Sequence, residues 1–205
     1  VIGWSFQQGM GQNMFPFYVS DFFTNFVTFF DKSQIPYWLV FMELIKIVLS
    51  GFVFFKFLKQ LQVTSFAAFI TALMYSFSGY MILGGCWTVF SAEALYAAVI
   101  LYGFERWLQQ GKFFWLVIGI TLMALLQPFF LFMYTLLLAG YAIVRYYDVR
   151  EKDTKKLLLF VAKTVGVATV AVLISSWQLF ADLLQYSESP RVGGEASFFA
   201  KLQKQ

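Results

Sequence analysis

Long apolar stretches limit the possible folds of this chain more strongly than any other feature of its sequence. The stretch from Tyr37 to Leu58 is long enough, at about 1.5 Å per helical residue, to cross a hydrocarbon core of about 30 Å. Comparable stretches run from Ser65 to Leu83 and from Ser91 to Leu108. Only 13% of the residues are charged, about half the share found in soluble domains. The sequence therefore predicts an all-α, polytopic transmembrane helical bundle.

Glutamine and proline divide the next apolar stretch. Residues 113–147 are too long for one span, and Gln127 and Pro128 interrupt them. Because proline lacks a backbone donor and clashes with the preceding turn, we expect two spans joined by a bend. A last span is expected from Leu157 to Ser176, which brings the bundle to about six spans.

The two ends of the chain are more polar than its centre. Residues 14–30 are aromatic but include Asp21, Thr24 and Asn25, a pattern that favours a helix lying in the membrane interface. The tail carries the turn-forming segment SESPRVGGE. We therefore expect three regions, which are an external loop and interfacial helix at residues 1–36, the six-span region at residues 37–176, and an external tail at residues 177–205.

Basic residues predict the orientation of the spans. Most of them fall on one side of the predicted membrane, namely Lys56, Lys59, Arg106, Lys112, Arg145, Arg150, Lys152, Lys155 and Lys156. The positive-inside rule makes that side cytoplasmic. The N-terminal loop, the turn at residues 84–90, the Gln127–Pro128 bend and the C-terminal tail are then expected on the extracytoplasmic side.

The chain lacks residues that several classes of function need. The chain has no histidine, which is the commonest metal nitrogen ligand and the usual proton shuttle near neutral pH. Its single cysteine, Cys86, cannot form an internal disulfide, and we interpret it as a small apolar residue. The net charge of +4 is largely explained by membrane orientation, so nucleic acid is not expected as a partner. Any chemistry is expected to use carboxylates, Lys or Arg.

Glu43, Lys46 and Glu93 are ionisable residues inside the predicted spans, where an unpaired charge is expensive. Glu43 and Lys46 are three positions apart and share one helix face, so they either neutralise each other or have a direct functional role. Glu93 lies near the outer end of the third span, where it either faces an external cavity or is solvated at the interface. The sequence leaves both pairs of alternatives open.

Further polar candidates are expected on the outer side. Asp21 and Asp31 flank the aromatic segment, and such carboxylates could bind a divalent cation, act as a base, or simply be solvated. Gln127 and Arg191 are on the same side. Arginine is suited to a phosphate group, although a structural salt bridge is the simpler interpretation of Arg191.

Three stretches resemble one known family. They are GMGQNMFPFYVSDFF at residues 9–23, ALMYSFSGYMILGGCWTVFSAEALYAAVILYGFERWLQQGK at residues 72–112, and LISSWQLFADLLQYSESPR at residues 173–191. The second contains a Tyr-x-x-Ser-Gly-aromatic motif, an acidic residue that starts the next span, and Gly-x-Glu-Arg at the end of that span. This order of segments resembles the YfhO family of bacterial membrane proteins, which belongs to the GT-C glycosyltransferase superfamily.

The chain departs from this family pattern at two places. Its third span lacks the usual central proline, and Glu93 stands where the family usually has Asp. The principal catalytic Asp of GT-C enzymes follows the first span, and the present chain is expected to begin after that point, as a fragment that lacks the first span. Such a fragment is not expected to be catalytic alone.

The resemblance implies a GT-C-like fold and transfer of a sugar from a polyprenyl-phosphate donor to an extracytoplasmic cell-surface glycan such as teichoic acid. It implies a place in the bacterial cytoplasmic membrane, with membrane lipid, sugar donor and glycan acceptor as partners and a divalent cation, Mg²⁺ or Mn²⁺, as a cofactor. The candidate catalytic carboxylates are Asp21 and Glu93. The candidate substrate-binding residues are Asn13, Glu43, Lys46, Gln127 and Arg191.

Two other functions compete with this interpretation. Glu43 and Lys46 could mark the substrate path of a transporter or flippase module, although the sequence shows no inverted repeat. The chain could also be a noncatalytic membrane subunit. An acidic residue just outside a preceding span would favour the transferase over both alternatives.

Overall fold

The computed structural model describes residues 4–5, 12–13, 21–85, 88–150 and 154–188, and almost all of them are helical. In chain order the helices are α2 (Phe22–Val27), α3 (Ile35–Gln60), α4 (Ser65–Ser76), α5 (Gly79–Gly84), α6 (Thr88–Gln110), α7 (Phe114–Leu126), α8 (Pro128–Val149), α9 (Thr154–Ile174) and α10 (Ser176–Glu188). A short antiparallel pair, β1 (Trp4–Ser5) and β2 (Gln12–Asn13), precedes them, with Trp4 opposite Asn13.

Five segments are long and apolar enough to cross a membrane. They are Ile35–Gln60, Ser65–Gly84, Thr88–Gln110, Pro128–Val149 and Thr154–Ile174. The predicted all-α, polytopic bundle is therefore confirmed. The stretch at residues 113–147 divides into α7 and α8 at Gln127, and Pro128 occupies the first turn of α8, where a missing N–H does no harm. With 13 residues, or about 20 Å, α7 is shorter than the five segments.

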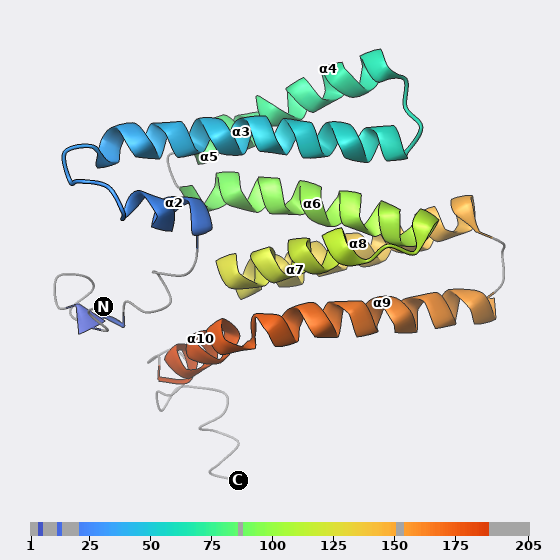
Figure 1. Ribbon diagram of the computed structural model, residues 1–205. Coiled ribbons are helices and arrows are strands. Elements are labelled where there is room, and N and C mark those ends of the chain that lie inside the picture. Colours follow the sequence, from blue (N-terminus) through green and yellow to red (C-terminus); the bar gives the residue numbers. More distant parts are fainter. Residues whose placement is uncertain (1–3, 6–11, 14–20, 86–87, 151–153, 189–205) are drawn as a thin grey trace, which may run out of the picture.

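Successive long helices run in alternating directions between two ends of the bundle (Figure 1). One end, which we name the α2 end, holds α2, α10 and the junction of α7 with α8. The other, which we name the basic end, holds the α3–α4 and α6–α7 connections with Lys59, Arg106 and Lys112. This arrangement agrees with the alternation expected from the distribution of Lys and Arg.

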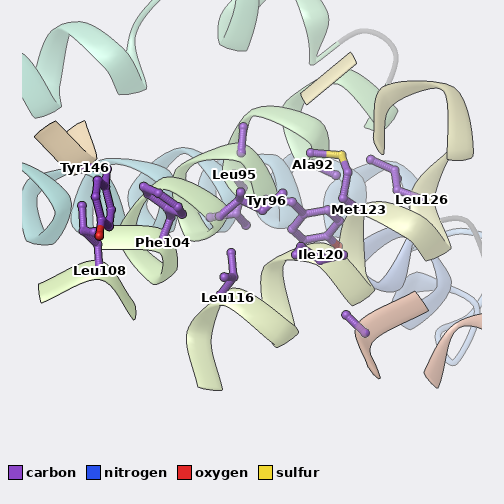
Figure 2. Packing of buried hydrophobic residues seen from close by; sticks show 13 residues of the cluster. Ala92, Leu95, Tyr96, Phe104, Leu108, Leu116, Ile120, Met123, Leu126 and Tyr146 are labelled. Atoms are coloured by element: carbon purple, nitrogen blue, oxygen red, sulfur yellow. The ribbon is translucent and has the colours of Figure 1, made fainter. Parts of the chain in front are cut away.

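Helix α6 is the centre of the bundle. It packs on α3, α5, α7 and α8, and its buried side chains form a core with those of α7 (Figure 2). A Cβ atom at Gly103 would overlap the backbone of Leu116, and one at Gly119 would lie 2.8 Å from Ile100 Cγ1. These two glycines therefore let the α6 and α7 backbones approach closely, as small residues do between membrane helices.

The outer helices expose large apolar side chains instead of burying them. Val48 of α3, Leu136 of α8 and Leu158 of α9 are more than half exposed within the chain. A soluble monomer rarely shows so much apolar surface, whereas a lipid-facing helix requires it. The helices that surround α6 therefore present their apolar sides to lipid.

Two predicted boundaries differ from the structure. The second span, expected to be continuous to Leu83, is broken between α4 and α5, where Ser78 caps α5 by accepting a hydrogen bond from the Met81 N–H at 3.4 Å. The last span ends at Ile174, and the Ser175 hydroxyl donates to the Ala171 carbonyl at 2.9 Å, a side-chain bond that bends helices. The expected tail then begins with a helix, α10, over residues 176–188.

Candidate functional site

Three of the predicted site residues meet at the α2 end of the bundle. The Lys46 ammonium lies 2.6 Å from a Glu43 carboxylate oxygen and 3.5 Å from an Asp21 oxygen. Lys46 is only 1% exposed and Asp21 only 3% exposed, so both charged side chains are buried inside the bundle. We name these three residues the α2-end cluster.

Local structure explains how Asp21 reaches Lys46, which is 25 positions away in the chain. Asp21 caps α2, because its carboxylate accepts hydrogen bonds from the Phe23 N–H at 3.1 Å and from the Thr24 hydroxyl. The Phe23 ring then lies 5.9 Å from the Lys46 ammonium, and Phe30 stacks on Trp38 of α3. These contacts hold α2 and the residues that follow it against α3.

Lys46 also connects the cluster to the central helix. Its ammonium donates a hydrogen bond of 2.8 Å to the carbonyl of Thr88, the first residue of α6. One side chain of α3 therefore contacts α2 through Asp21 and α6 through Thr88. Sequence spacing predicted the pair of Glu43 with Lys46, but it gave no signal for the contacts of Lys46 with Asp21 or Thr88.

Glu43 differs from its two neighbours in the cluster. Both of its carboxylate oxygens are buried, yet neither accepts a hydrogen bond from the residues that the structure describes. The 2.6 Å contact with Lys46 is thus an ion pair by distance but lacks hydrogen-bond geometry. With two carboxylates and one ammonium, the cluster carries a formal charge of −1 and retains acceptor capacity at Glu43.

Glu93 lies in a separate tyrosine-lined site near the same end. It is 4% exposed, which contradicts the alternative of a solvated interfacial carboxylate. The Tyr80 hydroxyl of α5 donates to it at 2.5 Å, and Tyr134 of α8 lies close to the same carboxylate. The Tyr75 hydroxyl of α4 donates to the neighbouring Ala94 carbonyl at 2.7 Å. In the described residues no hydrogen bond or ion pair joins Glu93 to the α2-end cluster.

The other predicted site residues are not brought into the α2-end cluster. Gln127 is exposed at the start of α8, and its side chain does not cap that helix. Asn13 lies in β2, and Arg191 lies outside the described residues.

In α10, burial raises the pKa of the Asp182 carboxyl, while the hydrogen bond from Gln178 at 3.1 Å acts in the opposite direction.

The α2-end cluster does not fit a metal ion. The part of the chain that the structure describes contains no group of three or more Asp, Glu or Cys side chains that could hold one. The Lys46 ammonium already lies close to the carboxylates of both Asp21 and Glu43. A divalent cation would have to displace that ammonium, because like charges repel at such distances.

A second buried charge cluster lies at the basic end, and the sequence did not reveal it. Glu105 of α6 is completely buried and forms an ion pair with Arg145 of α8, with contacts of 2.8 Å to Nε and 3.2 Å to Nη2. The Tyr141 hydroxyl and the Gln109 amide also donate to this carboxylate. Gln60 of α3 donates to Gln109 at 2.6 Å. We name this set the Glu105 network.

One signal could have predicted the Glu105 network. Glu105 and Arg145 both lie near the ends of apolar stretches, although Arg145 was interpreted only as a marker of orientation. An acidic residue at such a depth requires a partner, and Arg is the cation best suited to a two-point contact with a carboxylate. The tertiary pairing of α6 with α8 decides which Arg it is, and spacing alone does not contain that information.

Comparison with known families agrees with this architecture. The family described as "Bacterial membrane protein YfhO" matches residues 1–205. The chain belongs to the YfhO family. No curated protein and no solved structure matches it. The resemblance seen in the sequence is thus confirmed, and this YfhO-family chain is a multi-pass membrane protein.

The residues that carried the YfhO resemblance have identifiable places in the structure. In the Tyr-x-x-Ser-Gly motif, Tyr75 lies in the last turn of α4 and Ser78 lies in the break before α5. Glu93, the acidic residue that follows, is held by Tyr80. In the Gly-x-Glu-Arg motif, Gly103 contacts the α7 backbone and Glu105 forms the buried network. The family stretch at residues 72–112 thus contains Glu93 and Glu105, the two buried carboxylates of α6.

Proposed function

We propose that this YfhO-family chain is the membrane part of a glycosyltransferase of the GT-C type. It would take a sugar from a polyprenyl-phosphate donor and transfer it to an extracytoplasmic cell-surface glycan such as teichoic acid. The observation that supports this most is the α2-end cluster, where Glu43 has two buried acceptor oxygens that no described hydrogen-bond donor satisfies. Sugar hydroxyl groups are donors of the kind that such a carboxylate accepts.

The charge of the cluster determines which part of the substrate it suits. With a formal charge of −1 from Asp21, Glu43 and Lys46, the cluster would repel a phosphate but accept neutral hydroxyl groups. We therefore assign Glu43 to a sugar hydroxyl and Lys46 to holding the two carboxylates in place. Binding of the donor phosphate is assigned to Arg191, with Gln127 and Asn13 as further polar contacts at the substrate.

Of the two candidate bases, Glu93 is better suited than Asp21. Asp21 already accepts hydrogen bonds from Phe23, Thr24 and Lys46, so its lone pairs are engaged in holding α2. Glu93 would take the proton of the acceptor hydroxyl while that oxygen bonds to the anomeric carbon. The bond from the anomeric carbon to the phosphate oxygen breaks, and polyprenyl phosphate leaves with the electron pair.

An apolar groove on α3 and α4 supports a lipid-linked donor. It has a volume of about 320 Å³, and its lining includes Ile47, Gly51, Phe55, Phe69 and Phe77. The groove extends from Phe77, beside the break between α4 and α5, along the part of α3 that follows Lys46. A polyprenyl chain is an occupant of suitable shape and polarity for such a surface.

The proposed orientation places the α2 end on the extracytoplasmic side of the bacterial cytoplasmic membrane. The basic end would then face the cytoplasm, as the positive-inside rule requires. The expected divalent cation would need ligands other than the α2-end cluster, so we assign no step to it. Loss of transfer in EDTA, with recovery on adding Mg²⁺ or Mn²⁺, tests that expectation directly.

The test is an in vitro transfer assay with purified full-length protein and polyprenyl-phosphate sugars. Replacing Glu93 by Gln removes the base but keeps the side-chain size, so transfer should fall by about 10²- to 10⁴-fold. The matched control is Asp148→Asn, because Asp148 is an exposed carboxylate at the basic end, 3.5 Å from Arg145. Both variants should insert normally and elute as single species.

Two outcomes would contradict the proposal. Transfer by Glu93→Gln at the wild-type rate would remove Glu93 from the reaction. Movement of the donor across vesicles by the wild-type protein, without transfer of its sugar to any acceptor, would favour the flippase alternative.

A further inference from the structure

Lys163 is a charged residue in the middle of a lipid-facing helix. It is the tenth residue of α9, about 13 Å along the helix axis from Thr154. Its side chain is exposed, and it makes no hydrogen bond or ion pair with the residues that the structure describes. An ionisable residue at such a depth is expensive to maintain without a partner. This cation therefore calls for a partner from outside the described residues.

An apolar pocket of about 390 Å³ adjoins Lys163 on the surface of the bundle. Trp107, Phe113 and Val117 line it from α6, α7 and the residues between them, whereas Gly166 and Val170 line it from α9. The pocket thus extends from the α6–α7 connection at the basic end toward the centre of α9. Apart from Lys163, the residues that line the pocket are almost entirely apolar.

The walls of this pocket are fixed by specific contacts. The Trp107 indole N–H donates a hydrogen bond of 2.9 Å to the Thr164 hydroxyl, and the Trp107 ring stacks on Phe160. These contacts join α6 to α9 beside Lys163. Because side chains in a helix lean toward its N-terminus, the Lys163 stem leans toward the basic end.

We propose that Lys163 and this pocket form a binding site for an anionic phospholipid from the leaflet at the basic end. The lipid phosphate would pair with the Lys163 ammonium, and one acyl chain would lie over Gly166 and Val170 toward the bilayer centre. Charge complementarity selects this occupant, because the pocket has at its polar end a cation with no partner among the described residues, and an apolar floor beyond it. The site is separate from the α2-end cluster and does not depend on sugar transfer.

The experiment is a lipid titration of purified full-length protein by native mass spectrometry, with dioleoyl phosphatidylglycerol as the anionic probe and dioleoyl phosphatidylcholine as the zwitterionic one. The wild-type protein should retain the phosphatidylglycerol in preference to the phosphatidylcholine. Lys163→Gln should weaken that binding about tenfold, whereas Lys163→Arg should retain it. The control is Lys56→Gln, because Lys56 is an exposed cation near the basic end of α3, whose ammonium lies over Phe52.

A second variant tests the pocket separately from the charge. A Cβ atom at Gly166 would meet nothing within 4 Å, so Gly166→Leu should fold normally and fill the pocket. It should also weaken binding of the anionic lipid, although Lys163 is retained. Equal retention of the two lipids by the wild-type protein would overturn the proposal, as would unchanged binding by Lys163→Gln. If Lys163→Gln abolished binding while Gly166→Leu left it intact, the lipid would lie elsewhere and the proposed site would be wrong.

Discussion

The α2-end cluster and the Glu105 network both bury charged side chains against α6, yet they differ in how completely those charges are satisfied. Glu105 receives hydrogen bonds from Arg145, Tyr141 and Gln109. Glu43 has a nearby cation but accepts no hydrogen bond from the described residues. A fully satisfied network stabilises one packing arrangement, whereas an incompletely satisfied carboxylate retains capacity for a ligand.

The position of each set in the fold supports the same distinction. The Glu105 network joins three long helices, α3, α6 and α8, through side chains of those helices. The α2-end cluster instead depends on α2, which has six residues and is held to the bundle partly through Asp21. A short helix of this kind is easier to displace than a membrane span. We therefore interpret the Glu105 network as structural and the α2-end cluster as functional.

The largest expected effect comes from breaking the Glu105 network. Arg145→Met leaves the buried Glu105 carboxylate without its cation, and the free energy of unfolding should fall by about 3–5 kcal/mol. Unfolding of the purified protein in detergent measures the change. Arg106→Met is the matched control, because the side chain of Arg106 makes long contacts of 3.4 and 3.5 Å with Gln110 and Tyr102 and a cation–π contact with the Tyr102 ring, and no ion pair with a described residue. Equal losses in the two variants would contradict a structural role for the Glu105–Arg145 pair.

A smaller effect is expected from releasing α2. Asp21→Ala removes the α2 cap and one partner of Lys46, so the free energy of unfolding should fall by about 1–2 kcal/mol. Amide hydrogen exchange at residues 22–27 should rise, while exchange in α6 stays slow. Asp31→Ala serves as the control, because Asp31 is exposed in the same segment. Faster exchange in both variants to the same extent would show that Asp21 does not hold α2.

The smallest effect on stability is expected at Glu43. Glu43→Gln removes a charge that accepts no described hydrogen bond, and Lys46 keeps its contacts with Asp21 and Thr88. The free energy of unfolding should therefore change by less than about 1 kcal/mol, as measured by the same unfolding experiment. A loss as large as that of Arg145→Met would show that Glu43 is structural, and the contrast between the two clusters would disappear.

Sequence patterns predicted the span helices well because their signal is local. A run of apolar residues with few charges defines a span, and Pro128 marked the division between α7 and α8. The break between α4 and α5 was missed because Phe77, Ser78 and Gly79 are compatible with a continuous apolar helix. Whether they break the helix depends on how α4 packs against α3. The two helices are so close just before the break that a Cβ at Gly51 would overlap the Ser76 hydroxyl.

The candidate site was predicted only in part, for a similar reason. The pairing of Glu43 with Lys46 follows from a spacing of three along one helix. The addition of Asp21 depends on how α2 folds back on α3, and the pairing of Glu105 with Arg145 depends on which helices pack on α6. These contacts are tertiary, and a sequence without the arrangement of its helices does not specify them.

The most direct test of the central claim compares Glu43→Gln with Glu105→Gln in the full-length protein, measuring the unfolding free energy and the rate of sugar transfer per folded molecule. We expect Glu43→Gln to be nearly as stable as the wild type but to transfer little sugar. We expect Glu105→Gln to be clearly less stable, while the molecules that remain folded transfer sugar normally. Normal transfer by Glu43→Gln, together with impaired transfer by folded Glu105→Gln, would contradict the assignment of function to the α2 end.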